Sequence, residues 1–186
     1  MYPGSGHCGG TIIASKFVIT AAHCLYSWNE NLIALKELEA RNVAVRIGDH
    51  NIVEFGETGL EKFMNVHKIN FHEHWNRKII GSKVSNHWNY DIAILELEED
   101  IPLDVYTPAC VAKDTDGTTF DGKVITLAGW GFLNEYLFTQ NVPPVTTNVP
   151  YEVNVTVTQN CQDNTRPNNM CVGEYEDGKG SCRVRH

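Results

Sequence analysis

Two residues in the sequence are of the types that move and hold protons, and each lies beside an apolar run. His23 stands in residues 20–24 (TAAHC), directly after an apolar segment, and Asp91 immediately precedes the apolar run 92–95. A serine hydroxyl becomes a useful nucleophile only beside an imidazole that takes its proton, and a buried carboxylate can orient that imidazole. Taken singly, a histidine before a cysteine is usually a loop residue, and an aspartate before a strand is usually a turn residue. The surrounding segments therefore decide whether His23 and Asp91 are functional residues.

Those surrounding segments have the composition of β-strands. Residues 151–157 show this best, because apolar side chains alternate there with Glu, Asn and Thr, as on a strand with one buried face. β-Branched and aromatic residues also gather in shorter runs, at 11–13, 17–19, 43–47, 92–97 and 124–127. Clusters of Gly, Asn, Asp and Pro separate the runs. The pattern predicts an antiparallel all-β fold, either a sandwich or a pair of barrels.

Two further segments need a separate interpretation. Residues 31–41 (NLIALKELEAR) place Leu32, Leu35 and Leu38 at helical spacing, so we expect a short helix there. Residues 72–74 (HEH) suggest a metal site at first sight. Successive side chains of a strand point to opposite faces, so the three residues of this segment would not converge on one ion. We interpret the segment as a surface loop.

Composition and charge exclude several classes of protein. The 186 residues carry a formal net charge of −8 at pH 7 and are 42% hydrophobic, which is enough for one globular domain or two small ones. The acidic balance argues against binding nucleic acid or an anionic membrane, since both need clustered Lys and Arg. No apolar run is long enough to span a bilayer. We therefore expect no nucleic-acid partner and no membrane insertion.

Six cysteines indicate an oxidising compartment; they are at positions 8, 24, 110, 161, 171 and 182. The count alone leaves fifteen disulfide pairings open. There is no CxxC pair and no Cys/His set with zinc-finger spacing, so we expect no structural zinc site. Residues 154–156 (NVT) form the single N-glycosylation sequon, which by itself carries little weight.

Three motifs, in this order, strongly resemble the trypsin/chymotrypsin-like serine endopeptidases: TAAHC at 20–24 with CGG upstream at 8–10, NYDIAIL at 89–95, and LAGWG at 127–131. The resemblance runs from Cys8 to Cys182. It implies an all-β fold of two packed six-stranded antiparallel Greek-key barrels, both incomplete in this chain. Residues 1–108 would form the N-terminal barrel, without its first strand. Residues 109–186 would form a linker and part of the C-terminal barrel, without the nucleophile loop and C-terminal helix.

The resemblance implies roles for individual residues. His23 would be the general base and Asp91 the carboxylate that orients it, and their order along the chain agrees with this family. Gly180 and Ser181 would line the substrate pocket. Because Gly180 stands where trypsin-like members carry an aspartate, the resemblance disfavours cleavage after Arg or Lys.

The cysteines also match positions of the family. Two pairs correspond to its local disulfides, Cys8–Cys24 and Cys161–Cys171. Cys110 resembles the cysteine that is linked to a pro-region, which would be missing here. Cys182 resembles one whose partner lies beyond the nucleophile. We therefore expect two disulfides within the chain and two cysteines whose partners lie on missing sequence.

The resemblance predicts that the nucleophile is missing from this chain. In the family, Gly-Asp-Ser-Gly-Gly-Pro follows the segment that corresponds to 178–182, whereas residues 183–186 here read RVRH. His186 stands at the position of the serine, and the oxyanion loop is absent, which would remove a major catalytic contribution. We expect an inactive fragment of a secreted serine endopeptidase. The alternative is a non-catalytic homologue that acts as a secreted binding or regulatory module.

The expected partners are protein or peptide substrates and protease inhibitors. We expect no cofactor and no metal at the catalytic residues. Asp49 and Glu61 flank a loop at which some relatives bind calcium through carboxylates, so calcium stays open as an alternative. The loops at 24–45 and before Asp91 are longer than is typical of the family. We interpret these as surface insertions, with restriction of the substrate cleft as the alternative.

Overall fold

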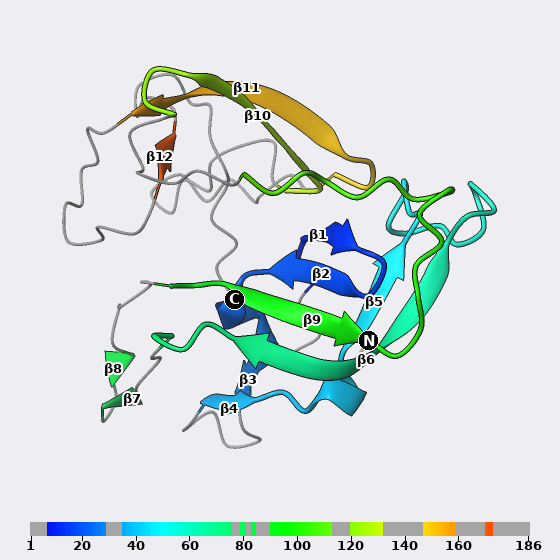
Figure 1. The fold of residues 1–186 in the computed structure, drawn as a ribbon, viewed down its shortest axis with the longest axis horizontal. Coiled ribbons are helices and arrows are strands. Elements are labelled where there is room, and N and C mark those ends of the chain that lie inside the picture. The colour runs from blue at the N-terminus through cyan, green and yellow to red at the C-terminus, as the bar shows by residue number, and fades with distance from the viewer. Residues whose placement is uncertain are drawn as a thin grey trace, which may run out of the picture. The chain divides into compact units, whose positions relative to one another are not determined.

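The computed structural model describes residues 7–28, 35–75, 79–80, 83–84, 90–112, 120–131, 147–158 and 170–172. The chain divides into two compact units (Figure 1): residues 1–48, 62–111 and 165–169 form the first, and 49–61, 112–164 and 170–186 form the second. The regular structure of the described residues consists of β-strands and two short 3-10 helices. This confirms the all-β prediction, and the two main sheets are consistent with an incomplete pair of barrels. None of the described helices is long and apolar enough to cross a membrane.

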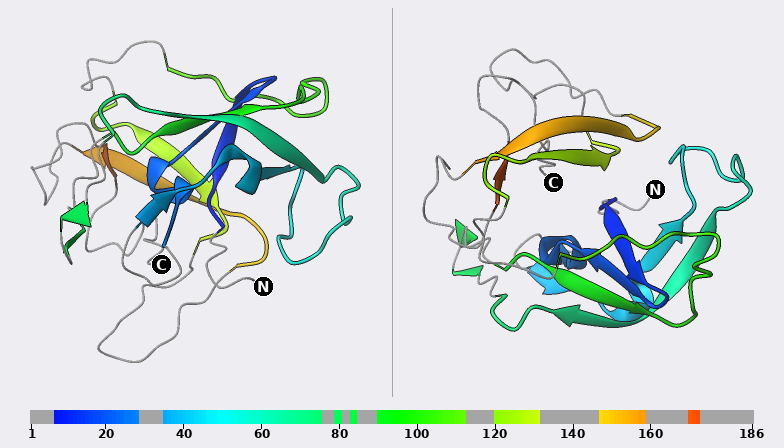
Figure 2. Two further views of the ribbon diagram at one scale, coloured as in Figure 1. Left: turned by 90° about the horizontal axis from the view of Figure 1, so that it is seen from below. Right: turned by 45° about the horizontal axis from the view of Figure 1, so that its top comes forward.

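A five-stranded antiparallel sheet forms the body of the first unit. Its strands are ordered β1 (Gly10–Ala14), β2 (Phe17–Thr20), β9 (Ala93–Leu97), β6 (Lys62–Phe71) and β5 (Ala44–Ile47). The sheet curls as the wall of a barrel does (Figure 2). Two small hairpins accompany it, β3 (Tyr26–Trp28) with β4 (Leu35–Glu37), and β7 (Ile79–Ile80) with β8 (Lys83–Val84).

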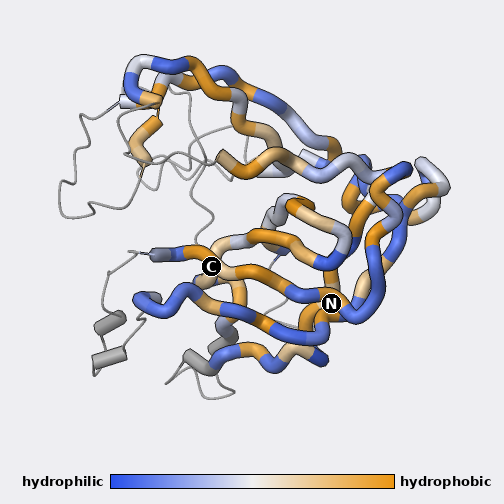
Figure 3. Tube along the Cα trace, in the orientation of Figure 1, coloured by the Kyte–Doolittle hydropathy of each residue, from blue (hydrophilic) through white to orange (hydrophobic). Residues whose placement is uncertain are grey.

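Alternation along the strands builds the core of the first unit. On β9, Ala93, Leu95 and Leu97 are buried, while Ile94 and Glu96 between them are more exposed. This is the period of two of a strand with one face in the core, and Figure 3 shows apolar and polar stretches following one another along the strands. The other buried members of the cluster are Val18, Ala22, Leu25, Ile47, Met64, Val66 and Ile101. Burial of this apolar surface is the main favourable contribution to the folding of the first unit.

The longest strand, β6, is not predicted by the sequence pattern. Its first half alternates properly, with Met64 and Val66 buried between exposed neighbours. The pairing with β9 then shifts between Val66 and Lys68. A bulge of this kind inserts a residue and breaks the period of two, so the apolar residues of the strand no longer fall at regular intervals in the sequence.

The helix predicted for residues 31–41 is wrong over its described part. Leu35–Glu37 form β4, which pairs with β3, and Ala40–Asn42 form one turn of 3-10 helix, η2. The backbone N–H of Leu38 donates to the carbonyl of Leu25 over 2.8 Å. Hydrogen bonds to an earlier part of the chain thus replace those of a local helix, and tertiary pairing overrides helix propensity. Residues 31–34 lie outside the described part.

The second unit holds a three-stranded antiparallel sheet. β11 (Tyr151–Thr158) pairs with β10 (Val124–Gly129) along the whole of β10, and its last two residues pair with β12 (Cys171–Val172). Val155 and Val157 are buried, whereas Asn154 and Thr156 are exposed. The alternation predicted for residues 151–157 is therefore confirmed from Val153 onward, whereas Tyr151, predicted on the buried face, is exposed. The boundary expected after residue 108 stays a prediction.

Candidate active site

His23 and Asp91 lie 68 residues apart in the sequence, and the pairing of β2 with β9 brings them together. Thr20 and Ala93 are opposite each other at one end of this ladder. Because the strands are antiparallel, the chain that leaves β2 and the chain that enters β9 lie at the same end of the paired strands. His23 follows Thr20 closely, and Asp91 comes shortly before Ala93. The topology therefore delivers both side chains to one place.

The turn that carries His23 is η1 (Ala22–Leu25), a 3-10 helix directly after β2. Ala22 and Leu25 are buried in the core and anchor the turn, with exposed fractions of 0% and 3%. His23, between them, is half-buried. Small and apolar neighbours thus fix the backbone of the histidine while its side chain stays accessible.

A disulfide ties this turn to the segment before β1. Cys24 is bonded to Cys8, which confirms the predicted pairing. Close by, the hydroxyl of Thr20 donates to the carbonyl of Gly9 over 2.8 Å. Because the sulfurs of Cys8 and Cys24 are joined to each other, they are not thiolate ligands, so their closeness to His23 does not make a metal site.

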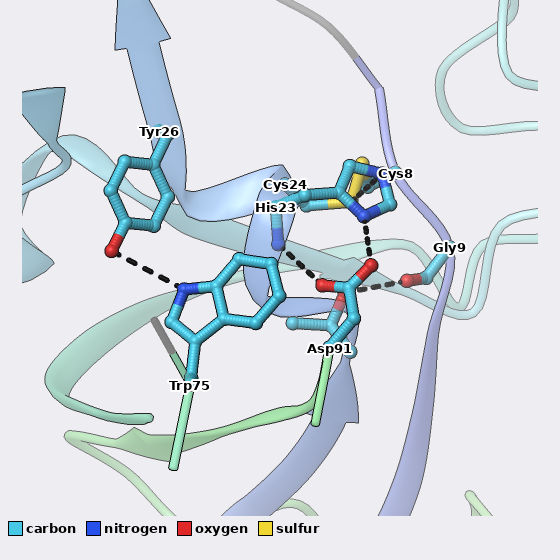
Figure 4. Close-up of polar contacts among 8 residues, drawn as sticks. Cys8, Gly9, His23, Cys24, Tyr26, Trp75 and Asp91 are labelled. Carbon is cyan, nitrogen blue, oxygen red and sulfur yellow. Dashed lines mark hydrogen bonds and ion pairs between the residues drawn. A yellow bond between two sulfur atoms is a disulfide. The ribbon is translucent and has the colours of Figure 1, made fainter. Parts of the chain in front are cut away.

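The carboxylate of Asp91 contacts His23 at two points (Figure 4). Its Oδ2 lies 2.6 Å from the ring Nδ1, and its Oδ1 accepts the backbone N–H of His23 at 2.8 Å. An ionised carboxylate only accepts, so the proton of the neutral imidazole lies on Nδ1 and the lone pair on Nε2. The side chains of His23 and Asp91 are 30% and 19% exposed. This arrangement prepares Nε2 to take a proton, while Asp91 stabilises the imidazolium that results.

Three aromatic side chains that the sequence does not assign to the site lie beside Asp91. Tyr90 has a φ of 58°, in the left-handed region that residues other than glycine seldom adopt. Its ring stacks on the imidazole of His72, with centroids 4.5 Å apart and an interplanar angle of 17°, and the ring of His74 lies 5.2 Å away. The backbone N–H of His74 donates to Nδ1 of His72 over 3.1 Å. We name Tyr90, His72 and His74 the aromatic clamp.

The aromatic clamp follows from the end of β6. The N–H of His72 donates to the carbonyl of Ile92 over 3.2 Å, and the N–H of Ile92 donates to the carbonyl of Tyr90 over 2.7 Å. The second bond closes a tight turn around Asp91, and the first ties that turn to the end of β6. Residues 72–74 follow β6 as a turn, so the prediction of a loop there is confirmed. No sequence signal marks the clamp, because the left-handed tyrosine depends on contacts from a distant strand.

A chain of hydrogen bonds connects the β3–β4 hairpin to the segment after β6. The indole N–H of Trp75 donates to the hydroxyl of Tyr26 over 3.3 Å (Figure 4). That hydroxyl donates in turn to Glu37 over 2.9 Å. The ring of Tyr26 also packs on Phe71, with 5.7 Å between centroids. Tyr26 directly follows η1. These contacts therefore hold the β3–β4 hairpin, which begins where η1 ends, against the end of β6.

Comparison with known proteins decides the family. Residues 2–183 match the family model described as Trypsin. The chain belongs to the trypsin family. It is 29% identical to coagulation factor IX of Cavia porcellus over 178 residues, which are 95% of this chain and 55% of that protein. It is 30% identical to chymotrypsin-like elastase family member 1 of Macaca fascicularis over 124 residues, 67% of this chain and 39% of that protein. The chain thus spans about half, or less, of the relatives that it matches.

The remaining site residues expected of a trypsin-family chain fall mainly outside the described part. Gly180 and Ser181 lie there, and so does Cys161. Cys171 is described and is disulfide-bonded. Cys110 is exposed and carries a free thiol. The pocket assignment, the partner of Cys171 and the link from Cys110 to a pro-region stay predictions.

The second unit of the trypsin-family chain gathers three carboxylates in the loop before β6. Side-chain oxygens of Asp49, Glu57 and Glu61 all lie within 4.8 Å of one another. Glu57 accepts the backbone N–H of Asn51, and Glu61 accepts that of Thr58 over 3.0 Å. Sequence reasoning named Asp49 and Glu61 but not Glu57, which the path of the loop brings to the other two. Oxygen donors of this kind suit a hard divalent cation.

We expect the aromatic clamp to act on Asp91 through both its ring stack and its backbone conformation. Tyr90→Phe keeps both and should be close to the original protein in free energy of unfolding. Tyr90→Gly keeps the left-handed backbone but loses the stack, for which we expect a loss of about 0.5–1.5 kcal/mol. Tyr90→Ala loses the stack and also strains the backbone, so it should be less stable than Tyr90→Gly. Urea unfolding of the three variants measures the order.

The order of stability is what tests the clamp. A Tyr90→Ala protein as stable as Tyr90→Gly would show that the left-handed backbone is not maintained in solution. A Tyr90→Phe protein as unstable as Tyr90→Gly would show that the ring stack contributes nothing.

Proposed function

We propose that this chain carries the proton-transfer residues of a serine endopeptidase, with His23 as general base and Asp91 as its orienting carboxylate. The observation that carries the proposal is the two-point contact, 2.6 Å from Asp91 Oδ2 to His23 Nδ1 and 2.8 Å from His23 N to Asp91 Oδ1. A single contact would let the carboxylate rotate, whereas two contacts hold it in the plane that the imidazole needs. Membership of the trypsin family supports the same assignment.

The reaction would proceed by acyl transfer. A serine Oγ attacks the carbonyl carbon of a peptide, the Oγ–C bond forms, and His23 Nε2 takes the hydroxyl proton. As the C–N bond breaks, the same proton passes from Nε2 to the leaving amine. Water then repeats the sequence and releases the acid. In this scheme Asp91 stays ionised and stabilises the charged imidazole, so the role of this chain is to hold and move one proton.

The nucleophile and its oxyanion hole are the parts that we do not assign to residues 1–186. The printed sequence has no Gly-Asp-Ser-Gly-Gly, and the family pattern puts His186 at the position of the serine. An imidazole there does not supply the hydroxyl. We propose that residues 1–186 by themselves form no acyl-enzyme, and that the substrates of an active form are proteins or peptides. Gly180 in the pocket disfavours Arg and Lys at the cleaved position.

A non-catalytic role is the second candidate, and His186 is the observation that favours it. In that case the chain would be a binding or regulatory module that keeps His23 and Asp91 without a nucleophile. Both candidates are proposed to act outside the cell, which the Cys8–Cys24 disulfide supports, since such bonds persist in oxidising compartments. Sequencing the transcript across the codon for His186 separates the two. Gly-Asp-Ser-Gly-Gly in any frame supports the protease, and an authentic stop codon supports the module.

We further propose that the loop at 49–61 binds calcium, with Asp49, Glu57 and Glu61 as ligands. Three carboxylates with oxygens within 4.8 Å repel one another, and a divalent cation between them would remove that repulsion. Backbone N–H bonds to Glu57 and Glu61 already orient two of the three. Calcium would act on the loop structure and not on the proton transfer at His23.

The proposed absence of a nucleophile from residues 1–186 gives one prediction. The 186-residue chain should not react covalently with a fluorophosphonate probe, because no activated serine hydroxyl is available to it. Gel fluorescence after labelling measures this, with an intact trypsin-family protease as the positive control. Labelling that His23→Ala abolishes, and Asp100→Ala leaves intact, would show that the chain has a nucleophile after all.

The proposed calcium site gives another prediction. Calcium at ten times its dissociation constant should stabilise the protein by about 1.4 kcal/mol, seen as a rise in Tm on titration. Magnesium should have a much smaller effect, because it needs tighter octahedral coordination. Glu61→Gln should weaken the response, whereas Glu99→Gln, on an exposed carboxylate in the other unit, should not. A Tm that calcium leaves unchanged would refute the site.

A further inference from the structure

We propose that Asn154 is a site of N-linked glycosylation, displayed on the outer face of the β10–β11 hairpin. This inference rests on the extracellular location proposed above, but not on any enzymatic activity. Residues 154–156 (NVT) form the only Asn-X-Ser/Thr sequon in the sequence. A sequon alone is a weak signal, since many are buried or unused. The strand on which it lies makes this one specific.

The first structural support is the face of β11 that the sequon occupies. Val155 and Val157 are 4% and 5% exposed and lie on the buried face of the strand, while Asn154 and Thr156 are exposed. Residues two apart on a strand lie on the same side. The acceptor amide and the threonine hydroxyl, the two side chains that define a sequon, therefore both face solvent. The alternation of hydropathy along this hairpin can be followed in Figure 3.

The second support is how the side chain of Asn154 is held. Asn154 is directly opposite Thr126 in the ladder with β10, and the hydroxyl of Thr126 donates to Oδ1 of Asn154 over 2.8 Å. This bond turns the amide oxygen toward β10. Within the described residues, Nδ2 makes no hydrogen bond, so attaching a sugar to it breaks no hydrogen bond among them. The remaining N–H of a glycosylated amide keeps a donor for solvent.

The third support is the room around the acceptor. On the same face, the neighbours of Asn154 are Thr126 and Thr156, with Val124 and Glu152 further along, and all of them are exposed. β12 pairs only with Val157 and Thr158, beyond the sequon. A bulky hydrophilic group at Asn154 would therefore project from the hairpin without displacing a core side chain.

The chemistry is a group transfer from a lipid-linked oligosaccharide in the secretory pathway. Nδ2 of Asn154 forms a bond to C1 of the first sugar, and the bond from C1 to the lipid pyrophosphate breaks. One amide proton passes to a base of the transferring enzyme, and the pyrophosphate leaves with its lipid. The same compartment oxidises cysteines, which agrees with the Cys8–Cys24 bond and with disulfide-bonded Cys171.

Cell-free translation with microsomes tests the site directly. The full chain, behind a cleavable secretion signal, is translated in their presence, and only the protease-protected fraction is analysed. We expect a single-glycan shift that peptide N-glycosidase removes, with conversion of Asn154 to aspartate seen by mass spectrometry. Asn154→Gln and Thr156→Ala should abolish the shift. Thr156→Ser keeps the sequon and should retain it, and Asn148→Gln, on an exposed asparagine outside any sequon, should leave it unchanged.

The display on the outer face has its own readout. The glycosidase should remove the glycan from the folded protein without denaturant, because the attachment point is solvent-exposed. Absence of a glycan from the translocated chain would overturn the proposal, and so would a shift that survives Asn154→Gln. A glycan released only after denaturation would overturn the outward placement. None of these results depends on fluorophosphonate labelling, so failure of the glycosylation proposal and failure of the protease proposal are distinguishable.

Discussion

The carboxylate of Asp91 accepts hydrogen bonds from two groups of one residue, the backbone N–H and the ring of His23. Two groups of His23 must therefore stay at 2.8 and 2.6 Å from a single side chain, which fixes the turn after β2 relative to the chain before β9. Hydrogen bonds of this kind weaken steeply when their geometry changes, so the contact tolerates little movement of either segment. Several other contacts of the first unit help to keep these two hydrogen bonds at their lengths.

The sheet supplies the first part of this support and local contacts supply the rest. β2 and β9 are central neighbours in the sheet, and Val18 and Leu95, which oppose each other in the ladder, are both buried in the core. On the histidine side, the Cys8–Cys24 bond adds a covalent restraint. On the aspartate side, the ring of Tyr90, whose backbone is left-handed, stacks on His72 and adds a contact directly beside Asp91. Each partner of the contact thus has its own device that limits its movement.

The sequence predicts the parts of this structure that depend on local pattern. The strands around residues 17–19 and 92–97 follow from apolar runs, and the pairing of His23 with Asp91 follows from family motifs beside them. The Cys8–Cys24 bond is likewise predicted from the family, not from the count of cysteines. The strands are encoded within a few residues each, whereas the two pairings are predicted only through the family motifs.

The features that the sequence does not predict depend on distant partners. The sequence pattern does not predict β6, because a bulge opposite β9 breaks its alternation. Residues 35–37 form a strand because they pair with β3 through hydrogen bonds. The left-handed Tyr90 stacks on the imidazole of His72, which the fold brings from the end of β6. Glu57 joins Asp49 only through the course of a loop. In each case the deciding interaction lies outside the window in which a pattern can be detected.

The central claim is that Asp91 holds His23 in one tautomer with its proton on Nδ1. Nitrogen-15 NMR of the His23 ring at neutral pH tests this most directly, with Asp91→Ala as the matched variant. The account predicts a protonated Nδ1 with a strongly downfield proton and an unprotonated Nε2 in the original chain, and loss of the downfield signal in Asp91→Ala. A ring protonated on Nε2 instead, or a spectrum that Asp91→Ala leaves unchanged, would contradict it.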